Sequence, residues 1–240
     1  VTAQEILREE DYLNDSFFLE VQNFFKKGKL PSELESSIEK ALKTLKGKCG
    51  EPCFTAVRSS AEEEDREFSF AGQFETVLNV PPEKKKVEYA YKEVLASLYS
   101  PKAISYKEQI MPKDKPISMS VGCITMVDAE VSGAMYSSDP NDLNNDVVII
   151  NASWGLGKTV VEGSVDADHF LIGKEEPYPI LYKKVGKKDF IIVTNKNGGI
   201  DKVPLPEEKQ GKTCLSEEQL RELVRQAILI EHYFKKPQDI

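Results

Sequence analysis

The sequence predicts an α+β fold with a helix-rich first half and a strand-rich second half. In the first half, apolar residues recur at the spacing of amphipathic helices. These helical segments are 4–27, 32–47 and 83–99. In the second half, turn-forming residues separate short apolar or alternating runs, which are typical of strands. These runs are 119–127, 131–136, 147–150 and 190–193.

Some elements carry local signals for where they begin. The second helix is expected to begin at Ser32, which stands at capping-box spacing from Glu35. Residues 53–57 are short and apolar and contain β-branched side chains, so they are predicted to form a strand. A last helix is expected to start at Ser216, where Gln219 completes a second capping box.

A polar segment that contains two prolines, 111–116, separates the two halves. At roughly 100–200 residues per domain, 240 residues suit one large domain or two small lobes. We therefore expect a first lobe over residues 1–113 and a second lobe over residues 114–240. Neither end has the polar tail that usually closes a domain, so the chain is expected to be a truncated piece of a longer protein.

The composition argues against some classes of function. The formal net charge is −8 and the pI is about 5.1, whereas a dedicated nucleic-acid-binding protein usually has a basic excess. An anion site stays open, because it needs only a few local donors. No apolar run approaches the ~20 residues of a membrane-spanning helix, and no signal peptide is visible. We therefore expect a cytoplasmic protein without a nucleic-acid or membrane partner.

The four cysteines are too few for a disulfide scaffold. Cys49 and Cys53 are separated by three residues, and no second Cys or His pair lies near them in the sequence. Two incidental thiols at a loop-to-strand junction are therefore favoured over a zinc or redox site.

A candidate phosphate site follows the first predicted strand. Arg58 leaves this strand together with two hydroxyl side chains, Ser59 and Ser60. A guanidinium group is a forked, always charged donor to phosphate oxygens, and hydroxyl groups add neutral donors. The alternative is that Arg58 only pairs with one of the acidic residues at 62–65.

The next loop has the composition of a phosphate-covering loop. Ala71 and Gly72 remove side-chain bulk, so the backbone can come close to a ligand. Gln73, Glu75 and Thr76 supply polar groups. A loop of small residues beside an arginine-bearing strand end is a frequent arrangement for holding phosphates. An ordinary turn has the same composition and is the alternative.

Two other features are rejected as catalytic sites. The stretch 154–159 resembles a Walker A motif, but Ala152 stands where that motif requires a glycine. It is therefore expected to be a glycine-rich turn, with Lys158 in solvent. Neither His169 nor His232 lies beside a serine or cysteine nucleophile in the sequence, so both are expected to be structural or exposed.

Several segments, in order along the chain, together resemble one protein family. They are 56–61, 68–80, 97–106, 126–135, 150–157, 160–163 and 237–240. This set is similar to the N-terminal nucleotide-binding domain of phosphoenolpyruvate synthases and pyruvate phosphate dikinases. The resemblance covers about residues 55–240. It implies an ATP-grasp fold, in which two α+β lobes clamp ATP.

The resemblance also implies a function that needs other domains. In this family, ATP with Mg²⁺ phosphorylates a histidine on a separate swivelling domain, and that histidine then phosphorylates pyruvate on a barrel domain. The implied partners are ATP and those two domains of the full-length protein. The chain alone is not expected to complete the reaction.

The implied site residues are those that match the family's motifs. Arg58 matches the arginine that holds the ATP phosphates, and it is the one residue to which we assign a catalytic role. The nucleotide-binding set is Arg58, Ser59, Gly72, Gln73, Thr76, Ile124, Thr125, Met126 and Gln238. Within this set, the backbone of 124–126 is expected to meet the adenine, and the loop that contains Gly72 is expected to cover the phosphates. No metal ligand is assigned.

Two alternatives remain open. The ATP-grasp domain could serve a phosphotransferase with another acceptor, for example an antibiotic. It could also be a degenerate, non-catalytic nucleotide-binding module. Ile124 stands where the family often has glutamine, and Lys158 stands where it often has an acidic residue.

Overall fold

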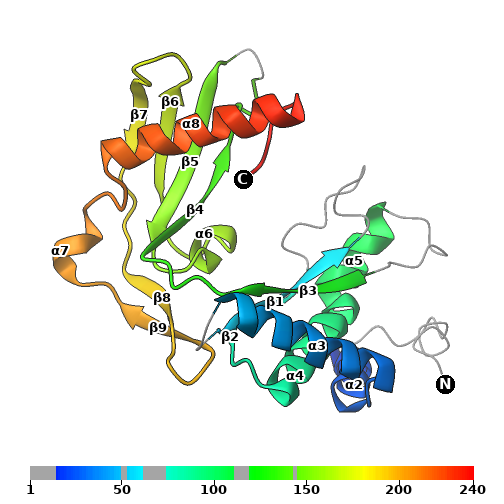
Figure 1. Ribbon diagram of the computed structural model, residues 1–240. Helices are drawn as coiled ribbons and strands as arrows, with labels where there is room; N and C mark the ends of the chain where they lie inside the picture. Colours follow the sequence, from blue (N-terminus) through cyan, green and yellow to red (C-terminus); the bar gives the residue numbers. More distant parts are fainter. Residues whose placement is uncertain (1–14, 50–52, 62–73, 111–118, 143–144) are drawn as a thin grey trace. The chain divides into compact units, whose positions relative to one another are not determined.

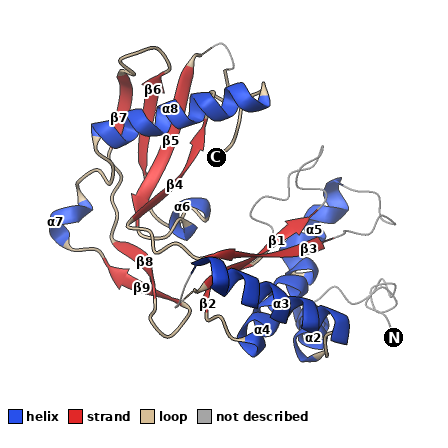
Figure 2. Cartoon of the chain, in the orientation of Figure 1, coloured by secondary structure: helices blue, strands red, loops and turns tan. Residues whose placement is uncertain are grey.

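A computed structural model describes residues 15–49, 53–61, 74–110, 119–142 and 145–240. The described residues confirm the predicted α+β class, with most helices in the first half and most strands in the second (Figures 1 and 2). The strands form three sheets, and all the strand pairs in them are antiparallel. The chain divides into two compact units.

The first unit comprises the residues up to Met126 together with Asn195–Gly199. Its sheet has the order β2-β1-β3. The strands are β1 (Thr55–Ala61), β2 (Thr76–Val80) and β3 (Met119–Thr125). The helices are α2 (Asp15–Lys27), α3 (Ser32–Cys49), α4 (Lys84–Ala96), the 3-10 helix η2 (Ser97–Tyr99) and α5 (Pro101–Ile110).

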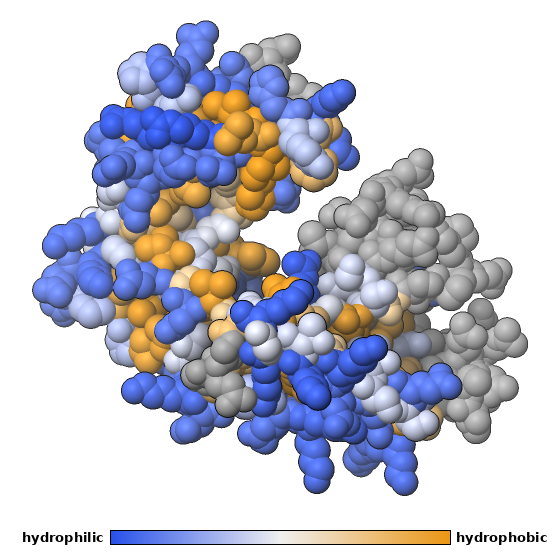
Figure 3. Space-filling model, viewed as in Figure 1, coloured by the Kyte–Doolittle hydropathy of each residue, from blue (hydrophilic) through white to orange (hydrophobic). Residues whose placement is uncertain are grey.

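Helices α3 and α4 cover one face of this sheet. Val57 of β1 is completely buried at the centre of the covered face. It belongs to one apolar cluster with Ile38 and Leu42 of α3 and with Val87 and Val94 of α4. Each helix thus buries one apolar stripe and turns its polar side to solvent. The outer surface over α3 is accordingly mostly hydrophilic in Figure 3.

The boundary of the first unit follows strand pairing rather than composition. The sequence predicts the division after residue 113, whereas residues up to Met126 group with the first unit because β3 pairs with β1 along its whole length. The loop Asn195–Gly199 is held in this unit by Asn79, whose Nδ2 donates to the carbonyl oxygens of Asn195 and Gly199, both at 2.7 Å.

The second unit comprises residues 127–194 and 200–240. Its main sheet has the order β4-β5-β6-β7, and β8 and β9 form a separate hairpin. The strands are β4 (Val131–Tyr136), β5 (Val147–Trp154), β6 (Asp168–Gly173), β7 (Ile180–Lys184), β8 (Phe190–Thr194) and β9 (Ile200–Pro204). The helices are α6 (Lys158–Val161), α7 (Glu207–Gln210) and α8 (Glu217–Phe234).

Helix α8 lies across the main sheet of the second unit and covers one face of it (Figure 1). Its buried residues Leu220, Val224 and Ala227 pack in one cluster with residues of β5 and β6. The predicted capping box is confirmed. The backbone NH of Gln219 donates to Oγ of Ser216 at 3.2 Å, and the backbone NH of Ser216 donates to the Gln219 side chain at 2.9 Å.

A buried ion pair ties loops of the second unit to β6. Lys188 and Asp168 are both completely buried, and Nζ of Lys188 donates to Oδ1 of Asp168 and, at 3.0 Å, to the carbonyl of Gly186. The backbone NH of Gly186 donates to Asp168 at 2.9 Å, and that of Cys214 donates to the other carboxylate oxygen at 2.8 Å. Each buried charge is therefore paired and hydrogen-bonded, which compensates for the loss of its contacts with water.

Predicted and observed elements differ mainly at their ends. The predicted helix 83–99 is α4 followed by a 3-10 turn, and the strand predicted at 53–57 begins at Thr55 and continues to Ala61. The first eleven residues of the predicted helix 4–27 lie outside the described residues. Within the described residues, no helix is both long and apolar enough to cross a membrane.

Candidate functional site

Strand β1 has two chemically different faces. Successive side chains of a strand point to opposite sides. Val57 therefore faces the helices, whereas Arg58 lies on the face that α3 and α4 leave open, and its side chain is exposed. The first unit thus presents a cation on the open face of its sheet.

The neighbours of Arg58 across the sheet leave room around its side chain. Its partner in β2 is Thr76, which is exposed, and its partner in β3 is Gly122. A Cβ atom added at Gly122 would lie 4.0 Å from Cγ of Arg58, an ordinary van der Waals distance, so the arginine stem lies beside this residue. Paired residues of antiparallel strands point to the same face, so Thr76 and Arg58 share the open face.

Among the described residues, the guanidinium group of Arg58 has only a weak hydrogen-bond partner. Its Nε donates to the carbonyl of Ser59 at 3.3 Å. Within the described residues, no carboxylate lies within ion-pair distance of Arg58. The acidic residues 62–65, which are its alternative partners in the sequence, lie outside the described residues.

The open face changes from polar to apolar along β3. Ile124 pairs with Ala56 of β1, two residues from Arg58, so its side chain lies on the same open face, where it is 52% exposed. The backbone NH of Met126 donates to the carbonyl of Phe54 at 2.9 Å, which extends the β1–β3 ladder beyond Thr125. The face therefore offers an apolar surface at one position and a cation with a hydroxyl at another.

Ser59 and Thr125 belong to the covered side of the sheet. Ser59 follows Arg58 directly and is buried, so the structure does not bring its hydroxyl together with the guanidinium group. The Thr125 hydroxyl lies 3.1 Å from Sγ of Cys49, at the end of α3. At the end of β3 where Ile124 lies, Thr125 therefore contributes its backbone and not its side chain.

The predicted covering loop is described only at its end. Gly72 and Gln73 lie outside the described residues. The backbone NH of Glu75 donates to Oγ of Ser97 at 3.1 Å, which fixes the point where the loop enters β2 at Thr76.

Gln238 lies in the second unit, where its backbone extends strand pairing beside β4. Its NH donates to Oγ of Ser137 at 2.8 Å, and its carbonyl accepts from the NH of Ser137 at 2.9 Å. The side-chain amide donates to the carbonyl oxygens of Lys236 and Pro237 at 3.2 and 2.8 Å. Its donors are therefore engaged by the chain itself.

The glycine-rich turn after β5 is a packing feature. Gly155 has φ +77°, and a Cβ atom there would lie 2.5 Å from the carbonyl oxygen of Ile192. Lys158 forms an i,i+4 ion pair with Glu162 at 3.1 Å. The close backbone approach explains why glycine is required at this turn.

The two histidines have no nucleophile as a described partner. Nδ1 of His169 lies 2.7 Å from Oδ1 of Asn151 on the neighbouring strand, and the ring makes an edge contact with Tyr182. His232 is exposed on α8. Among the described residues, no group of three or more His, Cys, Asp or Glu side chains could hold a metal ion.

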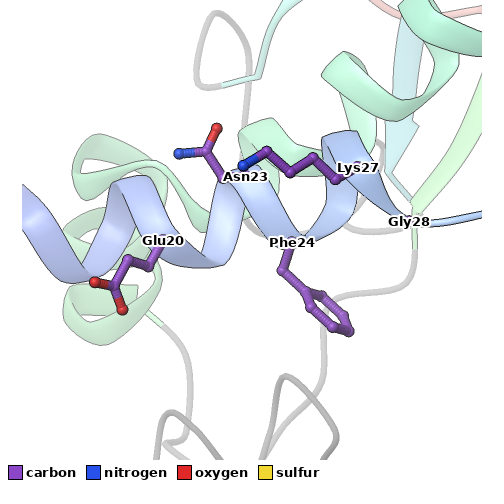
Figure 4. Close-up of a pocket in the computed structure, with 5 residues that line it drawn as sticks. All are labelled: Glu20, Asn23, Phe24, Lys27 and Gly28. Carbon is purple, nitrogen blue, oxygen red and sulfur yellow. The ribbon is translucent and has the colours of Figure 1, made fainter.

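A hollow of about 510 Å³ lies along α2, away from the residues of the open sheet face. Its lining residues are Glu20, Asn23, Phe24, Lys27 and Gly28. Figure 4 shows Asn23 and Lys27 on one side of the helix and Phe24 on the other. The polar groups do not converge on one point, as they do in a ligand site, so the open sheet face is the stronger candidate.

Comparison with known families identifies the chain. A family model described as "Pyruvate phosphate dikinase, AMP/ATP-binding domain" matches residues 9–240. The chain belongs to this family. As an AMP/ATP-binding domain it takes an adenine nucleotide as its ligand. Of the nine residues in the predicted nucleotide-binding set, three have side chains on the open face of the first unit, and two more lie at the adjoining end of β3. These five are Arg58, Thr76, Ile124, Thr125 and Met126.

Relatives of this AMP/ATP-binding domain are larger proteins. It is 34% identical over 222 residues to the "Probable phosphoenolpyruvate synthase" of Methanocaldococcus jannaschii, covering 92% of this chain and 18% of that protein. It is 35% identical to the phosphoenolpyruvate synthase of Deinococcus radiodurans, covering 92% of this chain and 29% of that protein. It is 36% identical to that of Escherichia coli, covering 87% and 27%. The chain thus spans less than a third of the length of these relatives.

One residue of the candidate site in the AMP/ATP-binding domain is absent from the predicted set. Gly122 stands opposite Arg58, and the arginine stem lies beside it. The signal in the sequence is a glycine inside an otherwise β-forming run, a position that often has a special role.

Proposed function

We propose that this chain is the ATP-binding domain of a phosphoenolpyruvate synthase-like phosphotransferase, and that ATP binds on the open face of the β2-β1-β3 sheet. The phosphates lie at Arg58 and Thr76, and the adenine lies along β3 at Ile124, Thr125 and Met126. The observation that carries the proposal is the exposed Arg58, placed between Thr76 and Gly122 and without an acidic partner among the described residues.

The chemistry of this face suits a nucleotide. The guanidinium group can form two parallel charged hydrogen bonds to phosphate oxygens, and the Thr76 hydroxyl can add a neutral one. The apolar side chain of Ile124 offers a surface for a flat base, and a strand edge offers backbone groups. Phosphoryl transfer depends mainly on positioning and on neutralising charge, which Arg58 would supply as the catalytic residue.

The proposed activity of the whole protein is supported by the family and by the names of the relatives. ATP would phosphorylate a histidine on a separate swivelling domain, and that phosphohistidine would transfer the group to pyruvate on a barrel domain. The first of these steps is the one in which this chain takes part. Mg²⁺ as a cofactor, a cytoplasmic location, and the roles of Ser59, Gly72, Gln73 and Gln238 stay predictions.

Calorimetry with Mg-ATP tests the site directly. The chain is expected to bind Mg-ATP, and Arg58→Ala is expected to weaken binding by about tenfold or more, since a hydrogen bond to a charged group contributes about 1.5–3 kcal/mol. Arg58→Lys keeps the charge but loses the forked arrangement of donors, so its affinity for Mg-ATP should lie between those of wild type and Arg58→Ala.

The matched control is Arg221→Ala on α8. Arg221 is exposed and forms an i,i+4 pair with Glu217. Its replacement by alanine therefore removes one positive charge without changing a residue of the β2-β1-β3 sheet. It should leave the affinity for Mg-ATP unchanged. Equal affinities of wild type and Arg58→Ala would remove Arg58 from the site.

Two residues favour the second candidate, a non-catalytic nucleotide-binding module. Ile124 and Lys158 depart from the residue types expected in the family, and Lys158 pairs with Glu162. The full-length protein, given pyruvate and ATP, distinguishes the two candidates. Formation of AMP supports the phosphotransferase, whereas ATP binding without any AMP supports the module.

A further inference from the structure

The end of α3 and the approach to β1 bring two cysteines to one edge of the first unit. Cys49 is the last residue of α3, and Cys53 lies two residues before β1. Sγ of Cys49 is 3.1 Å from Oγ1 of Thr125 at the end of β3. The backbone NH of Met126 donates to the carbonyl of Phe54 at 2.9 Å, which holds Cys53 beside the same strand end.

The two thiols interact with each other but differ in environment. Cys49 is exposed, whereas Cys53 is only 2% exposed, and each thiol influences the ionisation of the other. In redox-sensitive pairs an accessible thiol reacts with the oxidant, and a neighbouring thiol then attacks the oxidised sulfur and forms a disulfide with it. Within the described residues no third His, Cys, Asp or Glu joins them, so the arrangement favours two-thiol chemistry over a metal site.

The different surroundings of Cys49 and Cys53 also give the two thiols different reactivities. The hydrogen bond with Thr125 lowers the pKa of Cys49 most, and the neighbouring Cys53 thiol and the charge of Lys48 act in the same direction. Burial raises the pKa of Cys53, and the neighbouring Cys49 thiol adds to this. The exposed Cys49 is therefore the better nucleophile at neutral pH, because the thiolate is the reactive form.

We propose that Cys49 and Cys53 form a reversible dithiol–disulfide site whose oxidation weakens ATP binding along β3. The oxidant is a low-molecular-weight disulfide. The Cys49 thiolate attacks one of its sulfurs, the S–S bond of the oxidant breaks, and one thiolate leaves and takes up a proton. Cys53, losing its proton, then attacks the Cys49 sulfur and releases the second thiol. The two protein thiols lose two electrons in total, and the small disulfide is reduced to two thiols.

The effect on ATP rests on the proposed nucleotide site. An S–S bond is about 2.0 Å long and its sulfurs carry no proton, so oxidation repositions the Cys49 sulfur against Cys53 and weakens its hydrogen bond with Thr125. Thr125 and Met126 form the part of β3 proposed to meet the adenine. Weakening the bond between α3 and Thr125 loosens this strand end, and ATP binding must then also order it.

The experiment treats the chain with hydroxyethyl disulfide and then counts free thiols by alkylation and mass spectrometry. The expected product is a disulfide that joins Cys49 and Cys53 and that dithiothreitol reverses. Cys49→Ser and Cys53→Ser should each prevent it, whereas Cys123→Ser, on the half-buried thiol of β3, should not. Cys49→Ser changes an exposed residue, so it tests the site even where the buried Cys53→Ser fails to fold.

Calorimetry on the reduced and oxidised chain supplies the second measurement. Oxidation is expected to raise the Kd for Mg-ATP about fivefold or more. A chain that keeps both thiols, or that forms only mixed disulfides, overturns the site, and an unchanged Kd after complete oxidation overturns its effect on ATP. Absence of ATP binding by the reduced chain counts against the proposed function, while the thiol count still decides the disulfide site.

Discussion

The two units of the protein place a basic side chain in opposite environments. Arg58 of the first unit is exposed on an open sheet face and has no acidic partner among the described residues. Lys188 of the second unit is completely buried, and it donates to Asp168 and to the carbonyl of Gly186. A cation that is fully paired inside the protein serves the fold, whereas an exposed cation that has no acidic partner among the described residues is available to a ligand.

The physical reason is the cost of taking a charge out of water. A buried charge must be compensated within the protein, so Lys188 and Asp168 each have several partners, including the backbone NH groups of Gly186 and Cys214. An exposed guanidinium group stays hydrated and costs little in the unliganded protein. Changes at Lys188 should therefore affect stability, and changes at Arg58 should affect binding.

The largest effect on stability is expected for Lys188→Met. This variant leaves Asp168 buried without its counter-ion, which costs about 3–5 kcal/mol of unfolding free energy. Urea unfolding followed by the fluorescence of Trp154, the only tryptophan and a residue of β5 in the same unit, measures the loss.

Two further variants make the Lys188 result specific. Lys187→Met changes an exposed lysine next to it, whose pair with Asp189 is at 3.6 Å, and should cost less than about 0.5 kcal/mol. Asp168→Asn combined with Lys188→Met removes the unpaired charge and should recover part of the loss. A single Lys188→Met variant as stable as wild type would show that the pair does not hold this unit together.

A smaller loss is expected for Gly186→Ala. A Cβ atom at this position would lie 1.7 Å from the carbonyl oxygen of Asp166, so the loop that carries Lys188 must shift. Forcing a side chain into such a site costs about 1–3 kcal/mol. Gly211→Ala is the matched control, because nothing lies within 4 Å of an added Cβ atom there. Equal midpoints of the two variants in urea would contradict the steric reason.

Local signals in the sequence predicted much of the fold. The capping box at Ser216 and the apolar stripe of α8 depend on residues three or four positions apart, so a short window contains them. The ion pair of Lys188 with Asp168 joins residues 20 positions apart. In the sequence Lys188 stands beside Lys187 and Asp189, which is typical of an exposed turn, so no local signal distinguishes it.

The sequence motifs predicted Arg58 of β1 and Thr76 of β2 as site residues, and the structure places the two on one face of the sheet. The motif around Arg58 also grouped Ser59 with them. The alternation of side chains along β1 places Ser59 on the covered face, and this rule could have been applied to the sequence. The pairing of Arg58 with Gly122 depends on the register between β1 and β3, which only the folded sheet specifies.

A modest and pH-dependent loss is expected for Lys174→Met in the second unit. Nζ of Lys174 lies 3.0 Å from both carboxylate oxygens of Glu231 and 3.3 Å from Asp146. Partial burial alone would raise the pKa of Glu231, but its hydrogen bonds with Ser137 and Lys174 outweigh burial and lower it. Removing Lys174 should cost about 1 kcal/mol near pH 7.

The pH dependence follows from the sign of that shift. A carboxyl group whose pKa is lower in the folded state contributes stability above its unfolded pKa, about 4.3 for Glu, and loses it as the pH falls through the folded pKa. The difference between wild type and Lys174→Met should therefore shrink in urea titrations below about pH 4. Lys174→Arg, which keeps the charge, is the control, and a difference that stays constant down to pH 3 would exclude Glu231 as the cause.

The smallest effect on stability is expected for Arg58→Ala, and this variant tests the comparison most sharply. Within the described residues Arg58 makes one long hydrogen bond, to the carbonyl of Ser59, and its side chain is exposed. Its removal should change the free energy of unfolding by less than about 0.5 kcal/mol. Because Trp154 lies in the other unit, circular dichroism should follow this unfolding. A large loss of stability would place Arg58 with Lys188 as a structural cation, and weaker Mg-ATP binding at unchanged stability would separate the two roles.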